Sequence, residues 1–220
     1  MADFPGFPYA IPDFMDMIEP KLTELSGFGL ERFDLFDMMG TGHSLVSVMA
    51  SPKWKGRFNF HQLNDAEERL ISSRVRKLQG SLQKFFIYDP RRKYPLLDPT
   101  GSIVGSNTVQ IKAVGAGNNE IQLKGLPAAY EISVGDRGQI AFGTDSNWYF
   151  EFGNNRTADG IGDTGWLEIF PHVPIGIAVN NTVILKKPAC KVALVQNGFE
   201  PGNSFNKFTN GISIEFLEQV

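Results

Sequence analysis

The stretch Trp54-Lys55-Gly56-Arg57-Phe58-Asn59-Phe60 opens the segment that decides the fold class of this chain, residues 54–88. Its large rings occupy alternate positions, with small or polar residues between them. This period of two is typical of a strand that buries one face. The segment closes with Phe85-Phe86-Ile87-Tyr88, which predicts a second short strand before Asp89-Pro90.

Between these two strands the sequence predicts one helix near residues 65–79. Asn64 or Asp65 can cap its N-terminus, and the acidic residues that follow favour the positive end of the helix dipole. Gly80 stands where a left-handed residue commonly ends a helix. One apolar stripe has helical spacing, and it consists of Ala66, Leu70, Ile71, Val75 and Leu78.

The chain before Trp54 is harder to interpret. Residues 1–13 combine prolines with aromatic residues, so we expect an extended arm that covers either the protein's own core or a neighbouring subunit. The apolar spacing in residues 14–40 favours a partly helical stretch. Leu45, Val46, Val48 and Met49 are a strand candidate that leads to Trp54.

After Tyr88 the sequence becomes a series of short alternating patterns separated by turn residues. Residues 103–187 predict a compact all-β module of about six to eight strands. The strands expected near Cys190–Leu194 and Ile212–Phe216 would complete the earlier sheet. We therefore predict a mainly β fold: a β-sandwich with one helix, formed by residues 1–100 and 188–220, carrying an inserted all-β barrel or sandwich over 101–187.

Composition narrows the classes of function. Of the 220 residues, 42% are hydrophobic and 20% charged, as in an ordinary globular protein. A net charge of −3 gives no general attraction for nucleic acid, so no sequence-specific nucleic-acid partner is expected. No apolar run approaches the roughly 20 residues that span a bilayer, which predicts no membrane partner. The first residues lack the pattern of a signal peptide, which predicts synthesis in a cytoplasm.

The search for chemistry identifies no catalytic residue, no metal site and no cofactor. The glycines of 160–165 run into a strand pattern and not into a helix, so a β-turn is favoured over a dinucleotide site. Trp148, Tyr149 and Trp166 would form a sugar-stacking platform if they were exposed, although core packing is favoured. Arg91 and Arg92 indicate a solvated loop or a contact with an acidic partner. The protein is not expected to be an enzyme.

Several of these motifs together resemble baseplate proteins of long-tailed bacteriophages. The similar segments are Trp54-x3-Phe58-x-Phe60-x2-Leu63, Arg76-Lys77-Leu78-Gln79-Gly80, Lys84-Phe85-Phe86-Ile87-Tyr88-Asp89-Pro90, the run 125–136, and Lys187-Pro188-Ala189-Cys190. Within these proteins the sequence is most similar to the distal tail family. The resemblance covers residues 54–195, and its motifs are structural.

The resemblance implies a virion protein of the tail tip that forms a homo-oligomeric ring, a hexamer in that family, between a tail tube protein and a tip hub protein. The inserted module would then lie on the outside of the ring. Interface candidates are Phe4, Phe7, Tyr9, Trp54, Phe58, Phe60, Arg91 and Arg92. The alternative is a carbohydrate-binding β module for host attachment. A cell-wall hydrolase is disfavoured because no paired carboxylates are recognisable.

Overall fold

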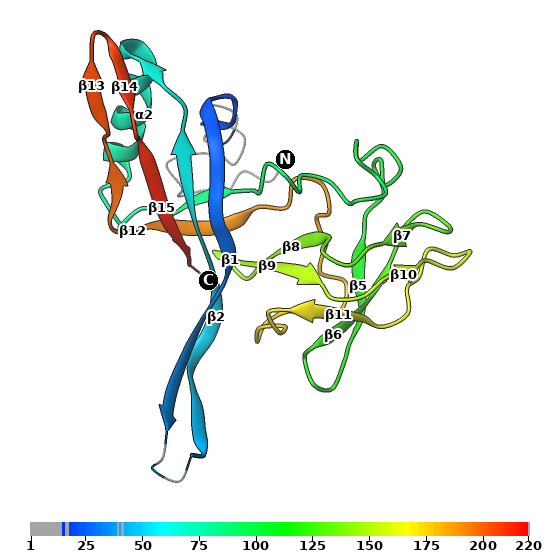
Figure 1. The fold of residues 1–220 in the computed structure, drawn as a ribbon. Helices are drawn as coiled ribbons and strands as arrows, with labels where there is room; N and C mark the ends of the chain where they lie inside the picture. The colour runs from blue at the N-terminus through cyan, green and yellow to red at the C-terminus, as the bar shows by residue number, and fades with distance from the viewer. Residues whose placement is uncertain (1–14, 16–17, 39, 41, 220) are drawn as a thin grey trace. The chain divides into compact units, whose positions relative to one another are not determined.

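The protein has a mainly β fold, as the sequence predicts: 47% of the chain is strand and 9% is helical (Figure 1). The computed structural model describes residues 15, 18–38, 40 and 42–219. The chain divides into two compact units. We call Lys21–Leu82 with Ala193–Gln219 the hairpin unit. We call Gln83–Val192 the barrel unit, which also includes the described residues among Met1–Pro20.

The hairpin unit contains an antiparallel sheet and a small three-stranded sheet. Within this unit the larger sheet has the order β1-β2-β15-β12, formed by β1 (Leu22–Met38), β2 (Ser44–Phe60), β15 (Ser213–Glu218) and residues 193–200 of β12 (Cys190–Glu200). The smaller has the order β13-β14-β3, formed by β13 (Asn203–Phe205), β14 (Phe208–Asn210) and β3 (Leu63–Asn64). A 3-10 turn, η1 (Glu19–Lys21), precedes β1.

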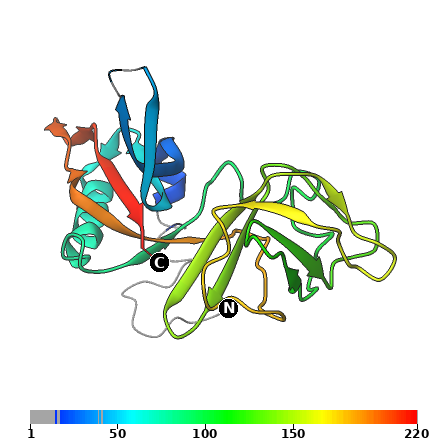
Figure 2. The same cartoon turned by 90° about the horizontal axis from the view of Figure 1, so that it is seen from below.

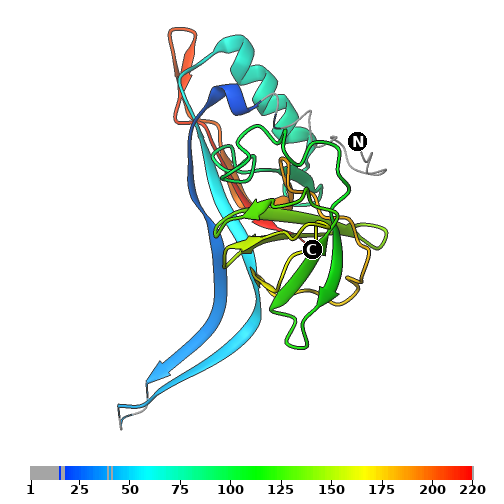
Figure 3. The ribbon, with the colours of Figure 1, turned by 90° about the vertical axis from the view of Figure 1, so that its right-hand side faces the viewer.

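Strands β1 and β2 form a long antiparallel ribbon of two 17-residue strands, visible in blue in Figure 3. The expectation of a partly helical stretch over residues 14–40 is confirmed at Met15, at Ile18 and in the 3-10 turn Glu19–Lys21, and is wrong for Leu22–Met38, which is strand throughout. The pairing of β1 with β2 is interrupted by register shifts, one of them between Ser26 and Gly29, where Gly27 has a φ of +61°. Each bulge adds a residue and shifts the alternation of faces. The apolar positions of β1 therefore lose the period of two and can be mistaken for helical spacing.

Helix α2 (Asp65–Lys77) begins as predicted, with Asn64 as its N-cap. The Asn64 side chain accepts a hydrogen bond from the Glu67 amide, and the Glu67 carboxylate accepts one from the Asn64 amide, at 2.9 and 3.1 Å. This reciprocal pair is a capping box. The helix ends at Lys77 with Leu78 as its C-cap, and the left-handed conformation expected at Gly80 begins one residue earlier, at Gln79. Of the predicted stripe, Ile71, Val75 and Leu78 are buried, whereas Ala66 and Leu70 are exposed.

The barrel unit contains a curled sheet, a half-barrel whose open side is spanned by an extended segment (Figure 2). The sheet order β5-β6-β11-β9-β8 is formed by β5 (Gln110–Val114), β6 (Glu120–Lys124), β11 (Leu167–Phe170), β9 (Ser146–Phe152) and β8 (Arg137–Phe142). Residues 180–184 hydrogen-bond to edge strand β5 through Ile111 and to edge strand β8 through Gln139. Strands β7 (Glu131–Ile132) and β10 (Arg156–Thr157) pair separately.

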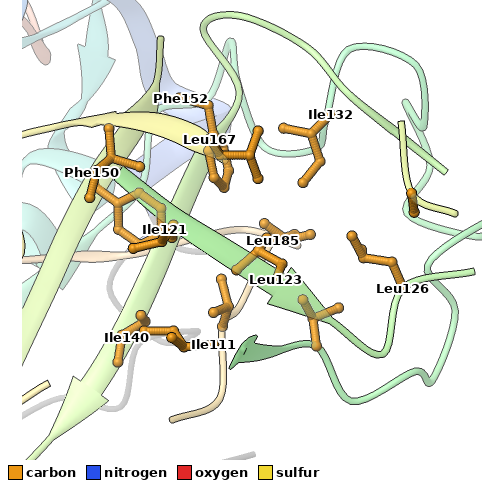
Figure 4. Close-up of a cluster of buried hydrophobic side chains, with 14 of the residues drawn as sticks. Ile111, Ile121, Leu123, Leu126, Ile132, Ile140, Phe150, Phe152, Leu167 and Leu185 are labelled. Atoms are coloured by element: carbon orange, nitrogen blue, oxygen red, sulfur yellow. The ribbon is translucent and has the colours of Figure 1, made fainter. Parts of the chain in front are cut away.

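The core of the barrel unit is a cluster of aliphatic and aromatic side chains (Figure 4). It includes Ile111, Ile121, Leu123, Ile140, Phe150, Phe152, Leu167 and Leu185, each at most 3% exposed. These residues come from every strand of the half-barrel and from the segment that spans it. Burial of this set holds the sheet in its curled form.

The limits of the two units differ from the predicted limits of the inserted module, residues 101 and 187. Contacts divide the chain at Gln83 and Val192 instead. The reason lies in two sets of bonds: β4 (Phe85–Ile87) pairs with Cys190–Val192, and Asp89 binds Arg137 of β8. Residues 83–100 and 188–192 therefore belong to the barrel unit.

Candidate functional site

The outer part of the β1–β2 ribbon, residues 33–38 and 44–50, exposes an unusual amount of apolar surface. We call this part the distal ribbon. Seven of its side chains are between 52% and 69% exposed: Leu35, Phe36, Met38, Leu45, Val46, Val48 and Met49. In the pairing register Phe36 lies opposite Val46, and Leu35 lies opposite Ser47. Because adjacent residues of a strand point to opposite faces, both faces of the distal ribbon are apolar.

Both edges of the distal ribbon are also open within the described part of the chain. Strand β1 is the edge strand of its sheet, and β15 pairs with β2 only between Lys55 and Asn59. An isolated two-stranded ribbon is only marginally stable in water. Open strand edges and large exposed apolar patches mark surfaces that associate with other chains. The distal ribbon is therefore the strongest candidate for an interaction surface.

At the other end of the same ribbon, the aromatic side chains of residues 54–60 are buried inside the hairpin unit. Trp54, Phe58 and Phe60, predicted as interface residues, are at most 6% exposed and form core contacts instead. Phe216 of β15 lies between the rings of Phe58 and Phe28, at centroid distances of 5.0 and 5.8 Å. Their burial within one chain removes these three aromatic residues from the candidate interface. Phe4, Phe7 and Tyr9 lie outside the described residues.

The predicted sugar-stacking platform depends on exposed rings, and two of its three rings are buried. Trp148 is 2% exposed and stacks on Phe150 at 4.1 Å between centroids. Tyr149 is fully buried and its hydroxyl accepts a hydrogen bond from Arg137 at 3.1 Å. Only Trp166 of this set has appreciable exposure, 37%. Core packing therefore accounts for Trp148 and Tyr149.

The loop that follows β4 is held by a buried ion pair. The Arg137 guanidinium lies 2.9 Å from the fully buried carboxylate of Asp89. Burial alone would lower the pKa of Arg137, but Tyr149, Asp89 and Glu151 outweigh this effect and raise it. This ion pair fixes the start of the loop to β8.

The predicted interface residues Arg91 and Arg92 are exposed but are bound within their own unit. Arg91 forms an ion pair with Asp89, at 3.1 Å. Arg92 lies 2.8 Å from Glu151 and donates to the carbonyl of Gly135. Both guanidinium groups nevertheless remain on the surface, with exposed fractions of 60% and 45%. Their contact with a partner stays a prediction.

These arginines border two adjoining open hollows, which we together call the loop groove. The larger, about 400 Å³, is lined by Pro90, Arg91, Lys93, Tyr94, Pro95, Leu96 and Pro99. The smaller, about 220 Å³, shares Arg91, Tyr94 and Leu96 with it and adds Arg92, Val134, Gly135 and Asp136. The groove combines proline, aromatic and aliphatic surface with a basic rim.

Buried carboxylates fix the shape of the loop groove. Asp98 accepts from the amides of Ile103 and Val104, at 3.1 and 3.0 Å. Asp136 accepts from the amides of Leu96 and Ser133, at 2.8 and 2.9 Å. Burial raises the pKa of the Asp136 carboxyl, although these amides and the charge of Arg92 oppose the shift. An irregular loop with its backbone bonded in this way is pre-formed for binding.

The sequence does not identify the distal ribbon as a site, and of the loop groove it identifies only Arg91 and Arg92. The predicted strand at 45–49 has apolar residues at neighbouring positions, Leu45 with Val46 and Val48 with Met49. A strand with one solvent-facing side alternates apolar and polar residues, so this pattern is the signal that both faces are apolar. The loop groove had a weaker signal, the density of prolines around Tyr94. Its carboxylate partners come from residues far along the chain and carry no local pattern.

Chemistry-bearing clusters are not found in the part of the chain that the structure describes. Across residues 15, 18–38, 40 and 42–219, no group of three or more His, Cys, Asp or Glu side chains is arranged to hold a metal ion. Among the same residues, no helix has both the length and the apolar character that crossing a bilayer requires. The sequence matches no protein-family model, and comparison with curated proteins gives no match either.

Proposed function

We propose that this protein is a structural subunit of a bacteriophage tail tip or baseplate, which forms an oligomeric ring joining the tail tube to the tip hub. The observation that carries the proposal is the distal ribbon, with two apolar faces and two open edges. Such a surface promotes aggregation of a free monomer, whereas an ordered assembly buries it between subunits. The motif resemblance is the reason to propose a phage tail as the assembly. The exposed apolar surface of the distal ribbon is the physical reason to expect that copies of the chain associate.

The two edges of the distal ribbon suit a head-to-tail contact. One edge belongs to β1 and the other to β2, and the two strands are antiparallel. The β1 edge of one copy can therefore pair with the β2 edge of the next copy. Head-to-tail contacts of this kind close into a ring if the rotation between copies allows it. A closed ring leaves no strand edge open, and its apolar faces are available to the proteins above and below.

The charge of the distal ribbon fits a tail through which DNA passes. Residues 33–50 contain Asp34 and Asp37 but neither lysine nor arginine. Phosphate binding depends on lysine and arginine. A ring built from this ribbon would therefore not retain the nucleic acid in its lumen.

The experiment combines imaging with a matched pair of variants. The protein should be found at the tail tip of purified particles by labelling and electron microscopy, and its mass with the tail tube protein should correspond to a closed ring. The double variant Phe36→Ser/Val46→Ser removes one cross-strand apolar pair and should abolish ring formation. Leu82→Ser removes an exposed leucine of the hairpin unit outside the distal ribbon and should leave assembly intact.

Two results would contradict the proposal. The first is a double variant that assembles as well as the unmodified protein. The second is a protein that stays monomeric both alone and with tail tubes and is absent from the tail tip. Mass measurement in solution by itself is insufficient, because a ring subunit can require a template.

A further inference from the structure

We propose that the loop groove binds an extended acidic segment of a partner protein, with a carboxylate of that segment bound by Arg91 and Arg92. This inference goes beyond ring formation, because it concerns the barrel unit and uses no part of the distal ribbon. Three observations carry it: a network of charges that ends in these two arginines, the N–H groups that their guanidinium groups keep for a further anion, and the apolar side chains exposed beside them.

Five side chains of the barrel unit form a continuous network of ion pairs in which cations and anions alternate. Arg137 lies at its centre, 2.9 Å from Asp89 and 3.1 Å from Glu151. Asp89 pairs in turn with Arg91 at 3.1 Å, and Glu151 pairs with Arg92 at 2.8 Å. Three cations therefore share two anions, which leaves one excess positive charge. Because Arg137 and Asp89 are buried and both terminal arginines are exposed, the two ends of the network that reach solvent are cationic.

Each terminal arginine is held on one side and keeps N–H groups for a further anion. Asp89 accepts from Nε and Nη2 of Arg91, at 3.1 and 3.2 Å, and no bond within the described part of the chain uses Nη1. Arg92 donates through Nη1 to Glu151 and to the Gly135 carbonyl, so its Nε and Nη2 are unused among the described residues. A guanidinium group has five N–H groups and binds a carboxylate through two of them. Since each side chain is already oriented by its own ion pair, little rotamer freedom is lost on binding.

Both arginines line the smaller hollow of the loop groove, which also contains the carboxylate of Asp136. One oxygen of this carboxylate accepts from the Leu96 amide and the other from the Ser133 amide. The Asp136 side chain is buried, and these amides stabilise its charge. The charge that the hollow presents to solvent is therefore that of the arginines. Opposite charges across an interface steer the encounter and fix the register of the partner.

Apolar side chains beside the arginines favour a protein segment over other anions. Leu96 and Val134 are 70% and 58% exposed, and they line the same hollow together with Tyr94. The larger hollow continues this surface with Pro90 and Pro99. Extended segments bind aromatic-lined grooves of this kind. A phosphate group would leave the aliphatic side chains in water, whereas an acidic residue flanked by apolar residues covers them.

The test selects the ligand from a displayed library of random peptides, with the full chain as the target. Peptides that bind the double variant Arg91→Gln/Arg92→Gln are removed first, and the remainder are selected on the unmodified protein. We expect the enriched peptides to share an aspartate or glutamate next to aliphatic or proline residues. The double variant should keep its fold, because Asp89 and Glu151 each retain Arg137 as a partner. Thermal unfolding followed by circular dichroism verifies this.

Fluorescence anisotropy with the most enriched peptide measures the size of the effect. Arg91→Gln and Arg92→Gln should each weaken binding about tenfold, because each removes a charge-assisted contact with the carboxylate. Arg69→Gln, at an exposed arginine that also pairs with a single aspartate, is the matched control and should leave the affinity unchanged. Replacing the acidic residue of the peptide by its amide should weaken binding to the unmodified protein but not to the double variant.

Three results would overturn the inference: no enrichment, enriched peptides without a carboxylate, or equal affinity for the unmodified protein and the folded double variant. If the double variant does not fold, Arg91→Lys replaces it, since lysine keeps the charge and loses the bidentate edge. An unchanged affinity of Arg91→Lys would then overturn the inference. Phe36→Ser/Val46→Ser, which tests the ring, should bind the peptide normally, so the failure of one proposal is distinguishable from the failure of the other.

Discussion

Strand β9 and the distal ribbon both carry large apolar side chains at neighbouring positions, but the surroundings of these side chains are opposite. In β9 the run Asn147-Trp148-Tyr149-Phe150 is buried on both faces, because Trp148 and Phe150 lie in the barrel core and Tyr149 bonds to Arg137 on the other side. In the distal ribbon the run from Leu45 to Met49 is exposed on both faces. The comparison teaches that apolar residues at neighbouring strand positions do not by themselves show whether the same chain covers them.

The largest expected change in the free energy of unfolding comes from a substitution in the buried strand β9. Phe150→Ala should lower the free energy of unfolding by about 3–5 kcal/mol, because it removes a fully buried ring and leaves a cavity in the core of the barrel unit. Denaturant unfolding followed by tryptophan fluorescence measures the change. A loss below about 1 kcal/mol would mean that this core is loosely packed and that β9 does not differ from the distal ribbon as described.

A smaller loss of stability is expected at the N-terminus of helix α2 in the hairpin unit. Asn64→Ala removes the N-cap of α2 and should cost about 1 kcal/mol of stability, with the helix otherwise unchanged. Asn64→Asp keeps an acceptor for the Glu67 amide and serves as the control. Thermal unfolding by circular dichroism is the measurement. An unchanged midpoint for Asn64→Ala would imply that α2 is held by packing of Ile71 and Val75 alone.

The smallest effect on stability is expected in the distal ribbon itself. Val48→Ser should change the unfolding free energy of the monomer by less than about 0.5 kcal/mol, since its side chain already faces solvent. Matched denaturation curves of the two monomers test this. A large loss would show that the valine is covered in the monomer, and the contrast with β9 would then fail.

Much of the fold was predictable because its signals are local. The alternation from Trp54 to Phe60, the cap at Asn64 and the strand patterns of the barrel unit depend on neighbouring residues, and each corresponds to an element of the structure. Strand β1 was not predictable in the same way, because its register shifts remove the period of two. The limits of the units depend on pairs such as Asp89 with Arg137, 48 residues apart, which leave no pattern in the sequence.

The candidate sites were less predictable than the fold, for the same physical reason. Exposure separates Trp148 from Trp166 and Phe58 from Phe36, yet residue type is the same within each pair. Burial is decided by which strands close over a position, and this depends on contacts distant in sequence. Arg91 and Arg92 were correctly expected in a solvent-exposed loop, but their partners Asp89, Gly135 and Glu151 were not expected.

The pairing of β4 with the first residues of β12 has a consequence for how this protein can vary. Phe85–Ile87 and Cys190–Val192 lie side by side as antiparallel neighbours, about 4.8 Å apart in a sheet. Residues 88–189 are therefore an insertion whose two ends lie next to each other. A different domain with closely spaced ends could be grafted at this junction, so residues 88–189 could be exchanged while β4, β12 and the hairpin unit are retained.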